Sequence, residues 1–538
     1  MASTETTWRS GLAVTLTVRA FRDARTRTIV FAALFGIYAY VQAFGYRRAY
    51  PTLADRLAFA ATFAANAGLR LFYGQPHDVV TVNGYVAWRV GGTLAIAAAA
   101  FGLLAPVRAQ RAEEDAGRTE LVLAGAVGRR TLSLSRLTAI GAGIVLIWVA
   151  EFVGLAGGGI PAGGAAYLAL ATASVIPVCV GVGAVTGQLA PNRRVALELG
   201  GAVVGLFFIL RAIADTTSGA AWLRWATPLG WAEELRPFAG PRPIVLLLPL
   251  VATLLLLLVS ERIAAHRDIG TGVLPTRDSA DPNLRLLSSP TLYALRSMRG
   301  TLLVWLATFV CFGLIFGIVS KSISSAGISA SLQKQIAKLG AGSIATPAGY
   351  LGFLFILVVL AVSFFVCSQV GAARQEEAEQ RLEILFAQPV SRYRWLTGRL
   401  VLAALAAAAI SLTAGLATWA GATSVGTDIS LPRMLEAGAN TLPAAILFLG
   451  IAALAYAAAP RAGLAIAYGV VTVAFLWQLV GAVLTAPHWL LDATPFAHVA
   501  LIPAQPFRPA AAAIMIAIGL VTALAASLVF RRRDLLGA

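Results

Sequence analysis

The chain has 538 residues, of which 58% are hydrophobic and only 12% are charged, whereas soluble domains carry roughly 25% charged residues. This composition excludes a soluble globular protein, because lipid must cover so much apolar surface. The net charge of +17 would suit nucleic acid, but the basic residues lie in short loops between apolar segments, as the positive-inside rule predicts. We therefore exclude a nucleic-acid partner and expect membrane lipid instead.

Apolar segments of about 20 residues predict an all-α polytopic membrane protein with about twelve transmembrane helices. Six segments precede a polar gap, near residues 29–46, 86–107, 134–155, 165–189, 197–215 and 243–261. Six follow it, near residues 302–319, 350–372, 400–422, 440–458, 462–485 and 509–530. An even number of spans places both termini on one side of the membrane. Roughly two-thirds of the Lys and Arg residues then lie on that side, which predicts cytoplasmic N and C termini.

The second half of the chain repeats the first. When the sequence is shifted by 263 residues, Arg111–Leu137 aligns with Arg374–Leu400 without a gap, and ten of 27 positions are identical. Shorter matches keep the same order: Arg22–Arg25 with Arg296–Arg299, Ala190–Pro191 with Ala459–Pro460, Ala226–Pro228 with Ala493–Pro495, and His266–Asp268 with Arg532–Asp534. We therefore expect two six-span domains, 1–285 and 286–538, related as parallel repeats about the membrane normal.

The long repeated segment joins the second and third spans of each domain, at about 108–133 and 373–396, on the side assigned to the cytoplasm. Its pattern predicts a short amphipathic helix, in which Glu113 or Glu114 pairs with Arg118, and Glu377 pairs with Arg381. The apolar flank suits a membrane interface or a partner's groove. The alternative is a solvated loop, which needs charge but no fixed order of charges. The candidate partner-contacting residues are Glu113, Glu114, Arg118, Glu120, Arg129, Glu376, Glu377, Arg381, Glu383 and Arg392.

These loops, the basic segment before each first span and the outer Ala-Thr-Pro segments resemble the permeases of ABC exporters. The resemblance covers nearly the whole chain and is closest to the actinobacterial polyketide-antibiotic class, represented by the tetronasin exporter permease. It implies a bacterial cytoplasmic membrane, with the two loops acting as coupling helices on ATP-binding subunits. It also implies interfacial helices around 8–27 and 290–299, and partly re-entrant segments at 216–241 and 486–507. The first loop departs from the second, with Gly125-Ala126-Val127 in place of Gln388-Pro389-Val390, so the two contacts need not be equal.

The chain has no phosphate-binding loop of its own. Such a loop requires the pattern G-x-x-x-x-G-K-[ST], and none of Lys321, Lys334 and Lys338 follows a glycine. If the resemblance holds, ATP and Mg²⁺ bind to a separate partner, and two coupling loops imply two copies of it. The chain is then a transport subunit and not an enzyme.

The remaining chemistry is sparse. The four histidines are too scattered for a metal site, and no spacing marks a nucleophile with its base, so we expect neither a metal nor a catalytic residue. Glu151 stands out as an ionisable residue within a span that has no compensating charge within a helical turn. Glu151 either lines the transport pathway or is partly buried near the outer interface.

The preferred function is export of hydrophobic or amphipathic compounds, such as an antibiotic, drug or lipid, by alternating access. A proton-coupled secondary transporter is the first alternative, because six-plus-six parallel repeats also describe that architecture. However, the paired glutamates are foreign to its loop motif. A polytopic membrane enzyme is the second alternative, and its usual pair of acidic or histidine residues on an outer loop is not evident. A permease-like sensor that transports nothing would share all these features.

Overall fold

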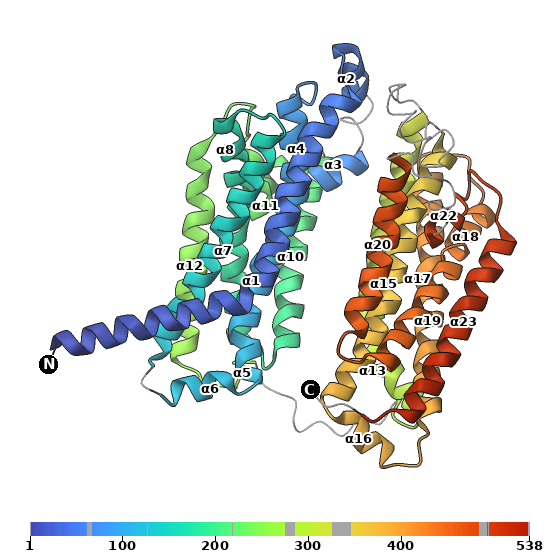
Figure 1. The fold of residues 1–538 in the computed structure, drawn as a ribbon. Helices are drawn as coiled ribbons and strands as arrows, with labels where there is room; N and C mark the ends of the chain where they lie inside the picture. The colour runs from blue at the N-terminus through green and yellow to red at the C-terminus, as the bar shows by residue number, and fades with distance from the viewer. Residues whose placement is uncertain are drawn as a thin grey trace. The chain divides into compact units, whose positions relative to one another are not determined.

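The computed structural model describes residues 2–61, 67–125, 127–217, 219–274, 286–324, 346–483, 492 and 494–535. Among these residues every regular element is a helix, and eleven helices are long and apolar enough to cross a membrane. A further helix contains the shorter apolar segment Gly463–Gln478. The prediction of an all-α polytopic membrane protein is therefore confirmed. The chain divides into two compact units, Met1–Ala280 and Asp281–Ala538 (Figure 1).

The first unit contains six long apolar segments joined by short helices. Its elements are α1 (Ala2–Ala49), α2 (Leu53–Phe59), α3 (Ala67–Tyr73), α4 (Val82–Val107), η2 (Arg108–Ala112), α5 (Glu113–Asp115), α6 (Arg118–Leu123), α7 (Arg129–Gly157), α8 (Ala162–Ala173), α9 (Val175–Leu189), α10 (Arg193–Thr216), η3 (Ala221–Ala226), α11 (Pro228–Glu234), η4 (Pro243–Leu246) and α12 (Leu247–Ala265). In this unit α5 and α6 lie at the end opposite to α2 (Figure 1).

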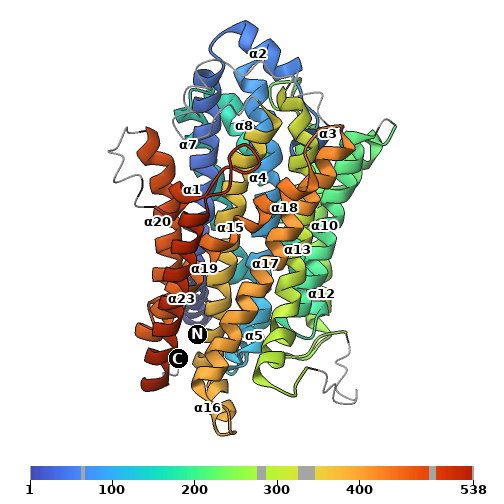
Figure 2. The same ribbon diagram turned by 90° about the vertical axis from the view of Figure 1, so that its right-hand side faces the viewer.

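The second unit repeats this order. Its elements are α13 (Pro290–Ser324), α15 (Pro347–Ala378), α16 (Arg381–Phe386), α17 (Arg392–Ser424), α18 (Leu431–Ala439), α19 (Leu442–Ala458), α20 (Gly463–Val483), α22 (Pro495–His498) and α23 (Pro509–Arg532). Figure 2 shows α16 projecting beyond the ends of the long helices α15 and α17, between which it lies in the chain.

The fourth apolar segment is broken in both units. In the first unit α8 ends at Ala173 and α9 begins at Val175, and in the second α18 ends at Ala439 and α19 begins at Leu442. A proline, Pro177 or Pro443, follows each break. Because proline lacks an N–H and its ring crowds the preceding turn, the same device interrupts the helix in both repeats.

The first and third long helices of each unit pack closely through small residues. A Cβ added to Gly154 of α7 would lie 2.1 Å from the carbonyl oxygen of Gly36 in α1. A Cβ on Gly421 of α17 would lie 2.3 Å from the carbonyl oxygen of Leu314 in α13. Small residues at helix crossings let backbones approach within a membrane, so these glycines fix the α1–α7 and α13–α17 contacts.

The first helix extends well beyond its apolar segment. The span expected near 29–46 is the C-terminal part of α1, and Figure 1 shows the N-terminal part of α1 turning away across one end of the unit. Val14 and Val18 on this part are 63% and 44% exposed. Exposed apolar residues on a basic helix suit a membrane interface, as the resemblance implies for this segment. The corresponding segment of the second unit begins α13 at Pro290.

Candidate functional site

The repeated loops fold into the same structure in both units. In the first unit α4 continues through η2 into α5, and a left-handed residue, Gly117 (φ +68°), precedes α6. In the second unit the left-handed residue before α16 is Gln380 (φ +60°), which aligns with Gly117 in the repeat. The predicted short helix is present in both units, as the six-residue helices α6 and α16.

The second glutamate of each neighbouring pair, Glu114 or Glu377, binds an arginine from the end of the same unit. Glu377 is buried and Glu114 is partly buried. Both carboxylate oxygens of Glu114 accept hydrogen bonds from Arg267, at 2.8 and 2.7 Å. Both oxygens of Glu377 accept hydrogen bonds from Arg533, at 2.9 and 2.7 Å. In the second unit Nη1 and Nη2 of Arg533 each donate to one oxygen of Glu377, a bidentate contact that combines strength with a defined geometry. In the first unit Nη2 of Arg267 donates to both oxygens of Glu114.

Two further contacts surround these pairs, and both recur in the two units. Arg111 lies 3.1 Å from Glu114, and its counterpart Arg374 lies 3.6 Å from Glu377. Arg129 donates to the backbone carbonyl of Arg267 at 3.1 Å, and its counterpart Arg392 donates to that of Arg533.

The hydroxyl of Tyr456 donates to Glu377 at 2.7 Å in the second unit only. We call these two clusters the end clamps: Arg111, Glu114, Arg129 and Arg267 in the first unit, and Arg374, Glu377, Arg392 and Arg533 in the second.

The predicted pairs along each loop are therefore only partly right. Arg118 binds Glu113 at 2.6 Å, and Glu114 is committed to the end clamp instead. The predicted pair between Glu377 and Arg381 is wrong, because Glu377 is buried in its clamp and Arg381 pairs with Glu379. The decisive partners, Arg267 and Arg533, lie more than 150 residues away, so helical spacing gives no sign of them. Their place in the repeated motif His266–Asp268 and Arg532–Asp534 was the available signal.

The candidate residues thus divide into buried and exposed groups. The side chain of Glu114 is 9% exposed and that of Glu377 is 1% exposed, and Glu376 is buried against Arg399. Glu120, Glu383, Arg118 and Arg381 are exposed. Leu121 and Ile384, which align in the repeat, are 77% and 74% exposed. Each short helix therefore exposes one apolar side chain between charged residues. The end clamp of that unit anchors the chain just before and just after the helix.

Glu151 lies in α7 and is completely enclosed within the first unit. Its carboxylate accepts a hydrogen bond from the Thr172 hydroxyl of α8 at 2.6 Å. The alternative of partial burial is therefore corrected to full burial, and a place on the transport pathway stays a prediction. The partner comes from the next span, where spacing along α7 could not reveal it.

The first unit also contains a buried ionic network at its other end. Arg211 and Asp215 lie 3.8 Å apart with fully buried side chains. This pair is joined by Glu233, 3.1 Å from Arg211, and by Arg224, 2.6 Å from Asp215. Glu234 extends the network by binding Arg224, Arg236 and Arg242.

Burial raises the pKa of the Glu233 carboxyl to about 8, against the opposing charge of Arg211. The segment around this network is the one that the resemblance describes as re-entrant. Its expected counterpart, 486–507, lies partly outside the described residues.

Among the described residues, no group of three or more His, Cys, Asp or Glu side chains is placed to hold a metal ion. The long apolar helices, the repeated helix order and the two clamped loops define a polytopic membrane protein built from an internal repeat. A family model described as the C-terminal domain of the multidrug efflux system permease Rv1217c matches residues 20–260 and 287–531, and the chain belongs to this family. The multidrug efflux system permease protein Rv1217c of Mycobacterium tuberculosis is 32% identical over 490 residues, which cover 90% of this chain and 88% of that protein.

Proposed function

We propose that this permease is the membrane-spanning subunit of an ATP-driven exporter and that α6 and α16 are its coupling helices. Each would seat on one copy of a separate ATP-binding subunit, which carries the ATP and Mg²⁺. The exporter would be of the polyketide-antibiotic, tetronasin-like type, with both termini in the cytoplasm of a bacterial cell. Its cargo would be a hydrophobic or amphipathic compound, in keeping with the efflux function that the relative's name gives.

The observation that carries this proposal is the equivalent presentation of Leu121 and Ile384. A single exposed apolar side chain is ordinary on a protein surface. Leu121 and Ile384, however, occupy the same position in two short helices that lie 263 residues apart in the chain, and each follows a glutamate, Glu120 or Glu383. The end clamps hold both helices in position through buried ion pairs. A solvated loop has no need of such a clamp.

The direct test is to purify the tagged permease from its native membranes and to measure how much ATP-binding subunit accompanies it. We expect the double variant L121E/I384E to lose that subunit, because two new carboxylates would face an apolar contact. The matched control is I244E, since Ile244 is 71% exposed on η4, at the other end of the first unit. Reversing the charge of Glu377 is not a suitable test of the contact, because it would disrupt the end clamp at the same time.

Equal recovery of the ATP-binding subunit with L121E/I384E, I244E and the unchanged chain would contradict the proposed contact. A permease that purifies alone, with export that collapses when the proton gradient is dissipated, would favour the secondary transporter.

A further inference from the structure

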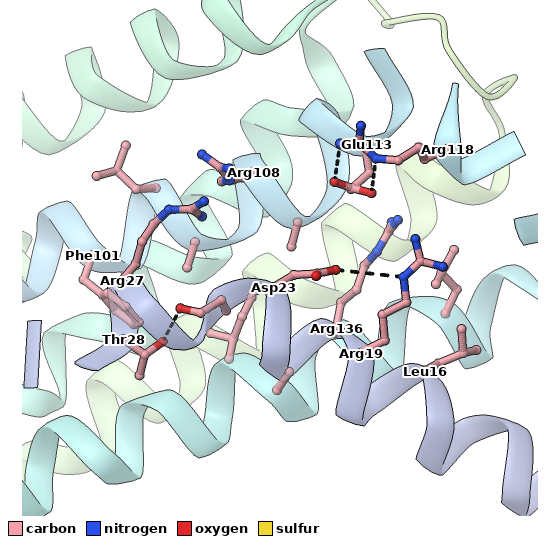
Figure 3. A pocket seen from close by; sticks show the side chains of 18 of the residues that line it. Leu16, Arg19, Asp23, Arg27, Thr28, Phe101, Arg108, Glu113, Arg118 and Arg136 are labelled. Atoms are coloured by element: carbon pink, nitrogen blue, oxygen red, sulfur yellow. Dashed lines mark hydrogen bonds and ion pairs between the residues drawn. The ribbon is translucent and has the colours of Figure 1, made fainter. Parts of the chain in front are cut away.

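A cavity of about 300 Å³ lies in the first unit beside the coupling helix α6. Its walls come from α1, α4, η2, α5, α6, α7 and the start of α10, and Figure 3 shows side chains that line it. Its lining includes the apolar residues Phe31 and Phe101, whose rings meet edge to face at 5.1 Å. It also includes six arginines, Arg19, Arg27, Arg108, Arg118, Arg136 and Arg193, and only two carboxylates, Asp23 and Glu113.

Both carboxylates already have partners. Glu113 binds Arg118 at 2.6 Å, and Asp23 lies 3.9 Å from Arg19. Within the described part of the chain, no carboxylate lies within 4 Å of the guanidinium groups of Arg27, Arg108 or Arg193. All three line the same cavity. The cavity therefore combines uncompensated positive charge with apolar lining residues.

The second unit provides an internal comparison. A cavity of about 340 Å³ occupies the equivalent place, beside α16. Glu376, Arg381 and Arg399 line it at the positions that Glu113, Arg118 and Arg136 occupy in the first unit.

The unpaired arginines do not recur in that second cavity. With the match of Arg22–Arg25 to Arg296–Arg299, Arg27 corresponds to Thr301, and with the loop alignment Arg108 corresponds to Gly371. The surplus is four positive charges in the first cavity and one in the second. If these arginines served only to keep the loop in solvent, both units would need them equally, because both loops leave the membrane in the same way.

We propose that the cavity of the first unit binds the phosphate headgroup of an anionic membrane phospholipid. Arg27, Arg108 and Arg193 would hold the phosphate, and the apolar lining residues Phe31, Phe101, Leu104 and Ile140 would contact the upper part of the acyl chains. Basic pockets between transmembrane helices at the cytoplasmic boundary are suited to acidic headgroups, and a guanidinium matches a phosphate in geometry. Because Arg118 and Val122 of α6 also line the cavity, the bound lipid would support one coupling helix and not the other. That last consequence rests on the proposed function.

The test uses the full chain alone, without any ATP-binding subunit, so that its outcome is independent of the exporter proposal. The delipidated permease is mixed with phosphatidylglycerol or with phosphatidylcholine, and retained lipid is counted by native mass spectrometry. We compare the unchanged chain with R27Q/R108Q and with R22Q/R25Q. The second variant removes the same charge from exposed positions of α1 outside the cavity.

We expect tight binding of phosphatidylglycerol but not of phosphatidylcholine, and a loss of about tenfold or more in R27Q/R108Q. The variant R22Q/R25Q should bind as the unchanged chain does. Equal retention of the two lipids, or equal losses in the two variants, would overturn the proposal. Thermal unfolding of each variant establishes that the fold is intact, which we expect because Arg27 and Arg108 are exposed.

Discussion

At the scale of single residues, burial separates side chains that look alike in the sequence. Glu113 and Glu114 are neighbours, yet Glu113 pairs along its own loop and Glu114 binds Arg267 at the end of the unit. Glu376 and Glu377 divide in a related way, since Glu376 binds Arg399 and Glu377 binds Arg533. Which partner each glutamate binds depends on segments that are distant in the chain. The spacing of residues along one helix does not show those segments.

Glu233 gives a pH dependence whose sign can be worked out. Its pKa is raised from 4.5 to about 8 by burial and, to a smaller extent, by the neighbouring carboxylate of Asp215, so the folded first unit holds a proton that the unfolded chain has released. The free energy of unfolding therefore falls as pH rises through this interval and levels off once Glu233 is ionised in the folded state as well.

We expect the thermal midpoint of the purified permease to fall by roughly a few degrees between pH 7 and pH 9, and E233Q to lack this fall. His77 is nearby, but burial and Arg236 lower its pKa, so it remains neutral throughout this range. Identical pH profiles for the two proteins would refute the assignment to Glu233.

At the scale of elements, the end clamp joins the loop after the second span to the segment after the sixth. We expect E377Q to lower the stability of the permease substantially, because it leaves Arg533 and Arg374 without their shared carboxylate, and removal of one partner from a buried ion pair costs about 3–5 kcal/mol. The measurement is thermal unfolding in detergent.

The control is E383Q, six residues further along the same loop. Glu383 is exposed, and surface substitutions usually change stability by less than about 0.5 kcal/mol. If E377Q and E383Q unfold at the same temperature, the end clamp does not stabilise the unit as we describe.

Much of the element order could be predicted from the sequence, because apolar segments of membrane length and a gapless repeat are strong signals. The short helices α6 and α16 also followed from their charge pattern. The breaks between α8 and α9 and between α18 and α19 were not predicted, although Pro177 and Pro443 mark both. The partners of Glu114, Glu377 and Glu151 were missed because they come from other helices, and one sequence does not show which helices pack together.

At the scale of the whole molecule, duplication gives the permease two equivalent short helices, α6 and α16, whose surroundings can differ. The end clamps and the exposed positions Leu121 and Ile384 are shared by both units. The cationic cavity beside α6 differs between the units, since the second has Thr301 and Gly371 in place of two cavity arginines. The two units therefore share a framework and differ in the charge beside their short helices.

The central claim is that both short helices seat on the same kind of ATP-binding subunit. The most direct measurement places a photo-crosslinking amino acid at Leu121 or at Ile384 in native membranes, with Ile244 as the control position. Our account predicts that positions 121 and 384 each form a crosslink with one and the same P-loop ATPase and that position 244 does not. Crosslinks to lipid alone at both positions, or the same products at all three positions, would contradict it.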